Sequence, residues 1–206
     1  LFGLKVPLNS GTADMYYEII DASLKQPEFK PRALFDKFNI EVLSTTDSPI
    51  DDLEAHKKIK DSGWQARIIP AYRPDNVIDP ETKNFTVNVE KLGELTGENI
   101  GNFSGYLAAH SVRRKFFKEA GATSTDHGHP TAHTENLPKA EVELLYDRAL
   151  RGVLSSEDSE RFRGHMLLEM AQMSLEDRLV MQLHPGSFRN HSPKIMLSYG
   201  SDRGFD

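Results

Sequence analysis

The sequence predicts an α/β fold: part of a (β/α)8 TIM-like barrel, with about four βα units after an N-terminal helical segment. Apolar strand candidates alternate with helical ones, which favours parallel strands joined by right-handed crossovers. No glycine-rich phosphate loop follows the first strand, which argues against a nucleotide-binding doubly wound sheet. A complete barrel needs about 250 residues. A chain of 206 residues that begins with helices would therefore hold only about half of one.

The first part of the chain, residues 1–38, is predicted to be helical. Asn9 or Thr12 can cap a helix that continues to about Gln26, because apolar residues recur along one of its faces. Pro31 suits the first turn of a second helix that ends at Lys37. The remainder, residues 39–206, is expected to be a partial barrel domain that is incomplete at both ends.

In this second part, strands and helices are predicted to alternate. The strand candidates are short apolar runs that end in polar residues, glycine or proline: residues 40–46, 66–72, 122–125 and 179–183. The helix candidates are supported by periodicity and by capping or stop residues: residues 51–61, 88–95, 103–120, 139–150 and 156–173.

The composition limits the classes of function. The net charge is −6 and the isoelectric point is about 5.8, so the chain has no basic footprint for nucleic acid or for a membrane surface. No apolar run approaches the roughly 18 residues of a membrane span. Cysteine is absent, which excludes disulfides and thiolate metal ligands within this chain and suits a cytoplasmic protein.

Polar residues follow each of the first two strands. Thr46 and Asp47 either serve the entry of the next helix or line the mouth of a barrel. Arg73, at the end of the second strand, either forms a surface ion pair with Asp75 or recognises a carboxylate or phosphate through its planar guanidinium. For Arg73 the functional interpretation is the better one.

A denser cluster follows the third strand, from Asp126 to Pro130. His127 and His129 are two residues apart, so on an extended segment they point the same way, as metal ligands or a substrate clamp require. The alternative is a tight turn with exposed histidines. A turn alone does not explain why several histidines occur in one short segment. Asp126 at the strand tip is the best candidate for a general acid/base or hydrogen-bonding group.

The richest cluster runs from His184 to His191, directly after the fourth strand. His184 ends an apolar strand and Arg189 follows five residues later. A merely solubilising loop fits poorly with a histidine at the end of a core strand. The other helical histidines, His56, His110 and His165, are expected to be solvated.

These clusters suit a small polar anion such as a sugar acid. The two arginines supply cationic groups. The strand-tip aspartate and the histidines supply groups that form hydrogen bonds and transfer protons. A serine nucleophile elbow and a cysteine nucleophile are both missing from the sequence, so proton transfer is favoured over acyl transfer.

Taken in order along the chain, the clusters resemble the uronate isomerase (glucuronate isomerase) family. The resemblance rests on residues 39–49, Arg73-Pro74-Asp75, residues 125–130 and residues 184–191, with a further similar stretch at residues 27–35. It implies a distorted barrel of the amidohydrolase superfamily that interconverts glucuronate with fructuronate and galacturonate with tagaturonate. It also implies that Arg73 and Arg189 hold the substrate, and that Asp126 and His184 contact the sugar as catalytic residues. His129 and Thr46 are further substrate-binding candidates.

The resemblance also implies a cofactor, a divalent metal ion of which zinc is the usual one. The family's ligands, a His-x-His pair on the first barrel strand and an aspartate on the last, have no counterpart here. The chain is therefore expected to be an internal fragment that is inactive by itself. A small-molecule uronate is the expected partner, without nucleic acid or membrane, and a homo-oligomer is left open.

Two rival functions remain at this point. A metal-dependent hydrolase of the same superfamily would use a metal-activated water. A non-catalytic sugar-acid-binding fragment would bind glucuronate without converting it. Neither explains the ordered set of motifs as well as an isomerase does.

Overall fold

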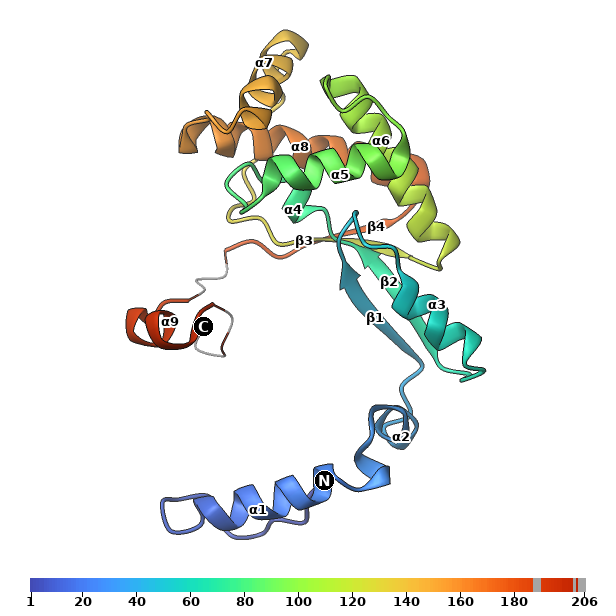
Figure 1. The fold of residues 1–206 in the computed structure, drawn as a ribbon, viewed down its shortest axis with the longest axis vertical. Helices are drawn as coiled ribbons and strands as arrows, with labels where there is room; N and C mark the ends of the chain where they lie inside the picture. Colours follow the sequence, from blue (N-terminus) through green and yellow to red (C-terminus); the bar gives the residue numbers. More distant parts are fainter. Residues whose placement is uncertain (187–189, 202, 204–206) are drawn as a thin grey trace. The chain divides into compact units, whose positions relative to one another are not determined.

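The computed structural model describes residues 1–186, 190–201 and 203. Figure 1 shows the succession of elements along the chain. The chain divides into two compact units, one formed by residues 1–43 and 64–67 and the other by residues 44–63 and 68–206. Each unit is described by itself.

The first unit is mainly helical. It contains α1 (Ala13–Leu24), a 3-10 turn η1 (Pro27–Phe29) and α2 (Pro31–Lys37), and both α-helices lie where the sequence predicts them. Trp64 returns to this unit and packs edge-on against Phe35, with ring centroids 5.1 Å apart. The Arg32 guanidinium lies 5.0 Å from the centre of the same indole ring.

The sheet confirms the predicted α/β class. It contains β1 (Val42–Asp47), β2 (Arg67–Tyr72), β3 (Ser124–His127) and β4 (Val180–Leu183), in the order β1-β2-β3-β4. β2 and β4 both pair in parallel with β3, and Asp126 stands opposite Gln182. Every strand thus neighbours its successor in the chain. A barrel has this order, whereas a doubly wound sheet reverses direction at a switch point.

Helices lie between the strands and after the last described strand. The described ones are α3 (Glu54–Asp61), α4 (Asp75–Ile78), α5 (Phe85–Thr96), α6 (Phe103–Glu119), α7 (Lys139–Leu150), α8 (Ser156–Asp177) and α9 (Pro193–Tyr199). Asn102 caps α6 and Ser155 caps α8 through their side-chain oxygens. α4 and α9, which the sequence analysis did not predict, are 4 and 7 residues long, too short for a clear periodic signal.

The core of the second unit lies where α5, α6, α7 and α8 pack together (Figure 1). Four aromatic residues form a continuous cluster there: Phe103, Tyr106, Tyr146 and Phe162. The buried phenol groups find acceptors, since Tyr106 donates to the carbonyl oxygen of Val77 at 2.7 Å. Burial is therefore combined with hydrogen bonding, as a tyrosine-rich core requires. No helix in the described part of the chain is long and apolar enough to cross a membrane.

The prediction that the helical histidines are solvated is wrong. His110 is fully buried and His165 is 6% exposed, while the side chain of His56 is 12% exposed. The Nδ1 atom of His110 lies 2.7 Å from the Tyr72 hydroxyl. The helices of this unit pack on several sides, so a polar residue on them can be buried wherever a partner hydroxyl or backbone group is within reach.

Burial makes His110 a determinant of stability at acid pH. Desolvation, aided by the positive charge of Arg114, lowers the pKa of His110 to about 3. The unfolded chain, in which the pKa is about 6.5, therefore binds a proton between those two values that the folded chain does not. Stability must fall as the pH falls through this window, by up to about 1.4 kcal/mol per pH unit for this one group.

We expect the His110→Asn variant to show a smaller loss of unfolding free energy between pH 6.5 and pH 4.5 than the unsubstituted protein. Urea unfolding at a series of pH values measures this slope. His133→Gln, which removes a histidine whose side chain is 43% exposed, is the control and should retain the original slope. An unaltered slope in His110→Asn would contradict the assignment.

Candidate functional site

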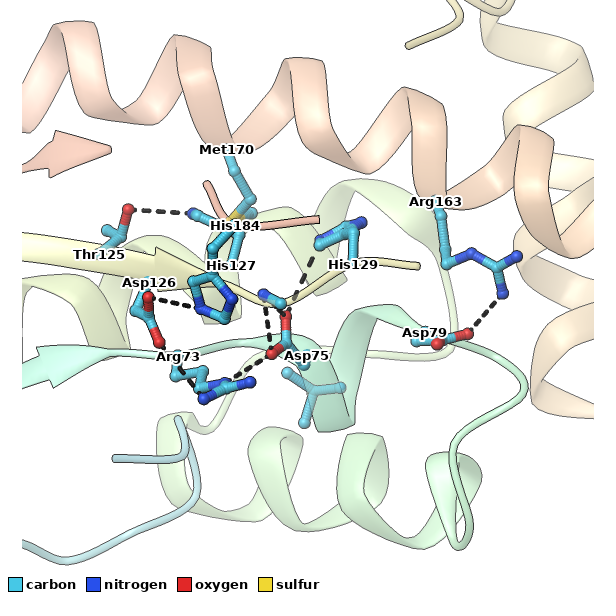
Figure 2. Close-up of polar contacts among 12 residues, drawn as sticks. Arg73, Asp75, Asp79, Thr125, Asp126, His127, His129, Arg163, Met170 and His184 are labelled. Atoms are coloured by element: carbon cyan, nitrogen blue, oxygen red, sulfur yellow. Dashed lines mark hydrogen bonds and ion pairs between the residues drawn. The ribbon is translucent and has the colours of Figure 1, made fainter. Parts of the chain in front are cut away.

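Three of the residues predicted from sequence meet at the carboxyl ends of β2, β3 and β4. Arg73 directly follows β2, Asp126 lies in β3, and His184 directly follows β4. Parallel strands present their carboxyl ends at one edge of the sheet, which is why segments distant in sequence converge here. Figure 2 shows the three side chains side by side.

Asp126 is the centre of this group. Its Oδ1 lies 2.9 Å from His184 Nε2, and its Oδ2 lies 3.4 Å from Arg73 Nη1. The Asp126 side chain is only 10% exposed, whereas those of Arg73 and His184 are 32% and 44% exposed. A nearly buried carboxylate thus positions a cation and an imidazole that remain accessible to a ligand.

Asp75 supports Arg73 from the other side. It is the first residue of α4, and its Oδ2 accepts a hydrogen bond from Arg73 Nε at 2.7 Å. The backbone N–H of Gly128 lies 3.1 Å from both Asp75 carboxylate oxygens. Arg73 is therefore held between two carboxylates, and the segment after β3 is attached to α4.

Gly128 occupies a position that excludes a side chain. A Cβ atom built there would overlap Nη2 of Arg73 and would lie 3.1 Å from both Asp75 Oδ2 and His184 Cε1. The backbone comes this close to the three side chains only because the residue is glycine.

Two histidines lie beside this group. His127 is fully buried and His129 is 5% exposed. Desolvation lowers the pKa of both imidazoles, that of His127 to about 3. Both rings are consequently neutral near pH 7. Together with Asp75 they form a group whose potential ligand atoms lie within 4.8 Å of one another, and which could hold a metal ion.

The other predicted residues are placed as follows. Thr46 lines a cavity of about 310 Å³ together with Ser48, Arg73, Asp75 and Asn76. The Nε2 atom of His129 lies 3.9 Å from Asp75 Oδ1, and His129 itself is buried. Arg189 lies outside the described residues. Their roles toward a substrate stay predictions.

Sequence reasoning undervalued Asp75 and Gly128. The sequence predicts Asp75 only as a surface partner of Arg73, because α4 is too short for a periodic signal and no local pattern indicates that its first residue contacts the segment after β3. The Arg-Pro-Asp order was the available signal, since a proline followed by an acidic residue marks the beginning of a helix.

The sequence profile of the glucuronate isomerase family matches residues 1–206, the whole chain. The uronate isomerase of Rhizobium meliloti (strain 1021) is 53% identical over all of this chain and 44% of its own length. That of Phenylobacterium zucineum (strain HLK1) is 52% identical and is covered to 43%. The chain thus spans less than half the length of these curated relatives.

Solved structures agree with the sequence relatives. The crystal structure of glucuronate isomerase from Caulobacter crescentus superposes with a TM-score of 0.89 at 47% identity, over 100% of this chain and 43% of the other. The uronate isomerase from Thermotoga maritima gives a TM-score of 0.86 at 28% identity and is covered to 45%. These structures have the TIM-barrel fold that the sequence predicted in part for this chain. The chain belongs to the glucuronate isomerase family.

Proposed function

We propose that this chain forms part of a uronate isomerase, which converts D-glucuronate to D-fructuronate and D-galacturonate to D-tagaturonate. The observation that carries the proposal is the Arg73–Asp126–His184 group at the carboxyl ends of three neighbouring strands. It combines a guanidinium for a carboxylate with a hydrogen-bonded carboxylate and imidazole for hydroxyl groups and protons. Membership of the family and the names of its relatives support the same activity.

The reaction needs proton movement and no net oxidation. The C2 proton of the aldose is removed, an enediol forms, and a proton is delivered to C1, while the O2 proton is replaced by one on O1. Arg73 orients the sugar acid through its carboxylate or hydroxyls. The Asp126–His184 pair hydrogen-bonds the sugar and can hold a proton at the imidazole.

A divalent metal ion, usually zinc by resemblance, would stabilise negative charge on a substrate oxygen when bound. The resemblance assigns it to ligands that have no counterpart in this chain. The cytoplasmic location suggested by the composition, and a homo-oligomer, stay part of the proposal.

The exposed edges of the sheet support a second expectation, that the 206-residue chain alone does not isomerise the substrate. β1 and β4 are the outer strands of the described sheet, and Val180 on β4 is 65% exposed. A barrel closes such edges with further strands, and its catalytic groups come from several of them.

Two proteins of different length test the proposal. One is the 206-residue chain, and the other is the protein extended to the length of its relatives. Incubation with D-glucuronate and D-galacturonate, followed by measurement of the ketose acid, should show turnover by the longer protein only. No turnover by the longer protein, supplied with zinc, would refute the isomerase. Turnover by the shorter chain would refute the argument that its site is incomplete.

Gly128→Ala should impair this activity with little effect on folding. The new methyl group would displace the ends of Arg73 and His184, which are flexible side chains, and not backbone. We expect kcat/KM of the longer protein to fall by about 10- to 100-fold, since a displacement of about 1 Å in a site can have this effect. The unfolding free energy should change by less than about 1 kcal/mol.

The matched control is Gly11→Ala, because an added Cβ there meets only the Asn9 side chain. It should leave both kcat/KM and the unfolding free energy unchanged. Full activity in Gly128→Ala would show that the close approach of the backbone at this position is not needed.

A further inference from the structure

Two buried imidazoles and a carboxylate converge next to the Arg73–Asp126–His184 group. His127 is the last residue of β3, His129 follows two residues later, and Asp75 begins α4. One potential ligand atom from each lies within 4.8 Å of the others. Figure 2 shows His127 and His129 on the same side of the β3 segment, with Asp75 between them and Arg73.

The two imidazoles each have a ring nitrogen that lacks a hydrogen-bond partner within the described part of the chain. These are Nδ1 of His127 and Nε2 of His129, and both atoms are inaccessible to solvent. A buried polar atom without a hydrogen-bond partner destabilises the fold unless a ligand or water satisfies it. Two such atoms close to one carboxylate form a donor set that suits a ligand with affinity for imidazole nitrogen.

The neighbouring contacts prepare the ligand atoms. His127 Nε2 lies 3.0 Å from Thr125 Oγ1. If the imidazole donates to this hydroxyl, the lone pair is on Nδ1, as a metal ligand requires. The Gly128 N–H fixes the Asp75 carboxylate, and Arg73 Nε binds its Oδ2, while Oδ1 is the oxygen nearest to His129. In metal sites, hydrogen-bond partners of this kind orient the side chains that bind the ion.

We propose that Asp75, His127 and His129 form a binding site for a divalent transition-metal ion of the zinc type. Two imidazole nitrogens and one carboxylate oxygen favour zinc or cobalt over magnesium and calcium, which prefer oxygen ligands. Arg73 shares Asp75 with the ion through the other carboxylate oxygen, which brings the ion next to the proposed substrate.

Cobalt(II) is the probe for this site, because its visible absorption reports the number and geometry of its ligands. The metal-free 206-residue chain is titrated with Co²⁺, and bound cobalt is counted by elemental analysis. We expect one ion per chain, with a tetrahedral or five-coordinate absorption band that zinc abolishes by competition. The thermal unfolding midpoint should rise with metal concentration, as linkage requires.

Three variants decide whether the ion is held where proposed. His129→Gln and Asp75→Asn should each lower the affinity for Co²⁺ by at least 10-fold and weaken the band. His133→Gln is the matched control, because it removes an exposed histidine only four residues from His129 and should change nothing. Far-UV circular dichroism shows whether each variant is folded. The proposal is overturned if the folded chain binds no stoichiometric cobalt, or if binding is lost in His133→Gln but survives in His129→Gln and Asp75→Asn.

Discussion

Replacing Arg73 by lysine should lower kcat/KM for D-glucuronate by at least 100-fold in the protein extended to the length of its relatives. The lysine keeps the positive charge, but it cannot reach Asp75 and Asp126 at once as the guanidinium does, through Nε at 2.7 Å and Nη1 at 3.4 Å. The substrate would lose a planar cation, and Asp126 would lose the group that fixes it opposite His184. Loss of one electrostatic contact of this kind typically reduces the rate by about 10²- to 10³-fold.

Arg67→Lys is the control for this variant, because it makes the same change at the opposite end of β2, at an exposed position. It should retain full activity. Kinetics with both uronates measure kcat and KM separately, so that loss of substrate binding is distinguished from loss of turnover. If Arg73→Lys retained more than a tenth of the original kcat/KM, the proposed role of the guanidinium would be wrong.

The sequence predicted that Arg73, Asp126 and His184 each follow or end an apolar strand. In a parallel sheet, position at a strand end is enough to place residues at one edge, whatever the length of the helices between them. The strands themselves were predicted to within a few residues. For β3, the prediction stopped at Thr125, whereas the strand continues to His127 because polar residues can occupy a strand end that lines a site.

What the sequence could not predict depends on distant contacts. The burial of His110 depends on Tyr72, which is 38 residues away, and the role of Asp75 depends on the backbone of Gly128. Neither pairing produces a pattern among neighbouring residues that could be recognised in the sequence. Arg189 was predicted to face the substrate with His184, and this stays a prediction because it lies outside the described residues.

The largest effect on stability is expected at Arg114, whose side chain is 1% exposed although it is charged. Its guanidinium makes two hydrogen bonds to the Asp177 carboxylate, at 2.6 and 3.0 Å, and one to Ser174 Oγ at 2.9 Å. These contacts join α6 to the end of α8, directly before β4. Removing Arg114 leaves the Asp177 carboxylate, whose side chain is 22% exposed, without its main partner. Breaking a fully buried ion pair costs about 3–5 kcal/mol, and the partial exposure of Asp177 places this pair at the lower end of that range.

Arg114→Met should therefore lower the unfolding free energy by about 3 kcal/mol, measured by urea unfolding, although the methionine fills much of the apolar space of the arginine stem. Arg151→Met is the control, because Arg151 pairs with Asp147 on the surface, where both side chains are about 60% exposed; it should cost less than about 1 kcal/mol.

In the double variant Arg114→Met/Asp177→Asn the uncompensated charge is gone, while the amide oxygen can still accept the hydrogen bond that Leu179 N–H donates to Asp177. We expect this variant to be more stable than Arg114→Met alone. If Arg114→Met were no more destabilising than Arg151→Met, the link between α6 and α8 would contribute little to the fold.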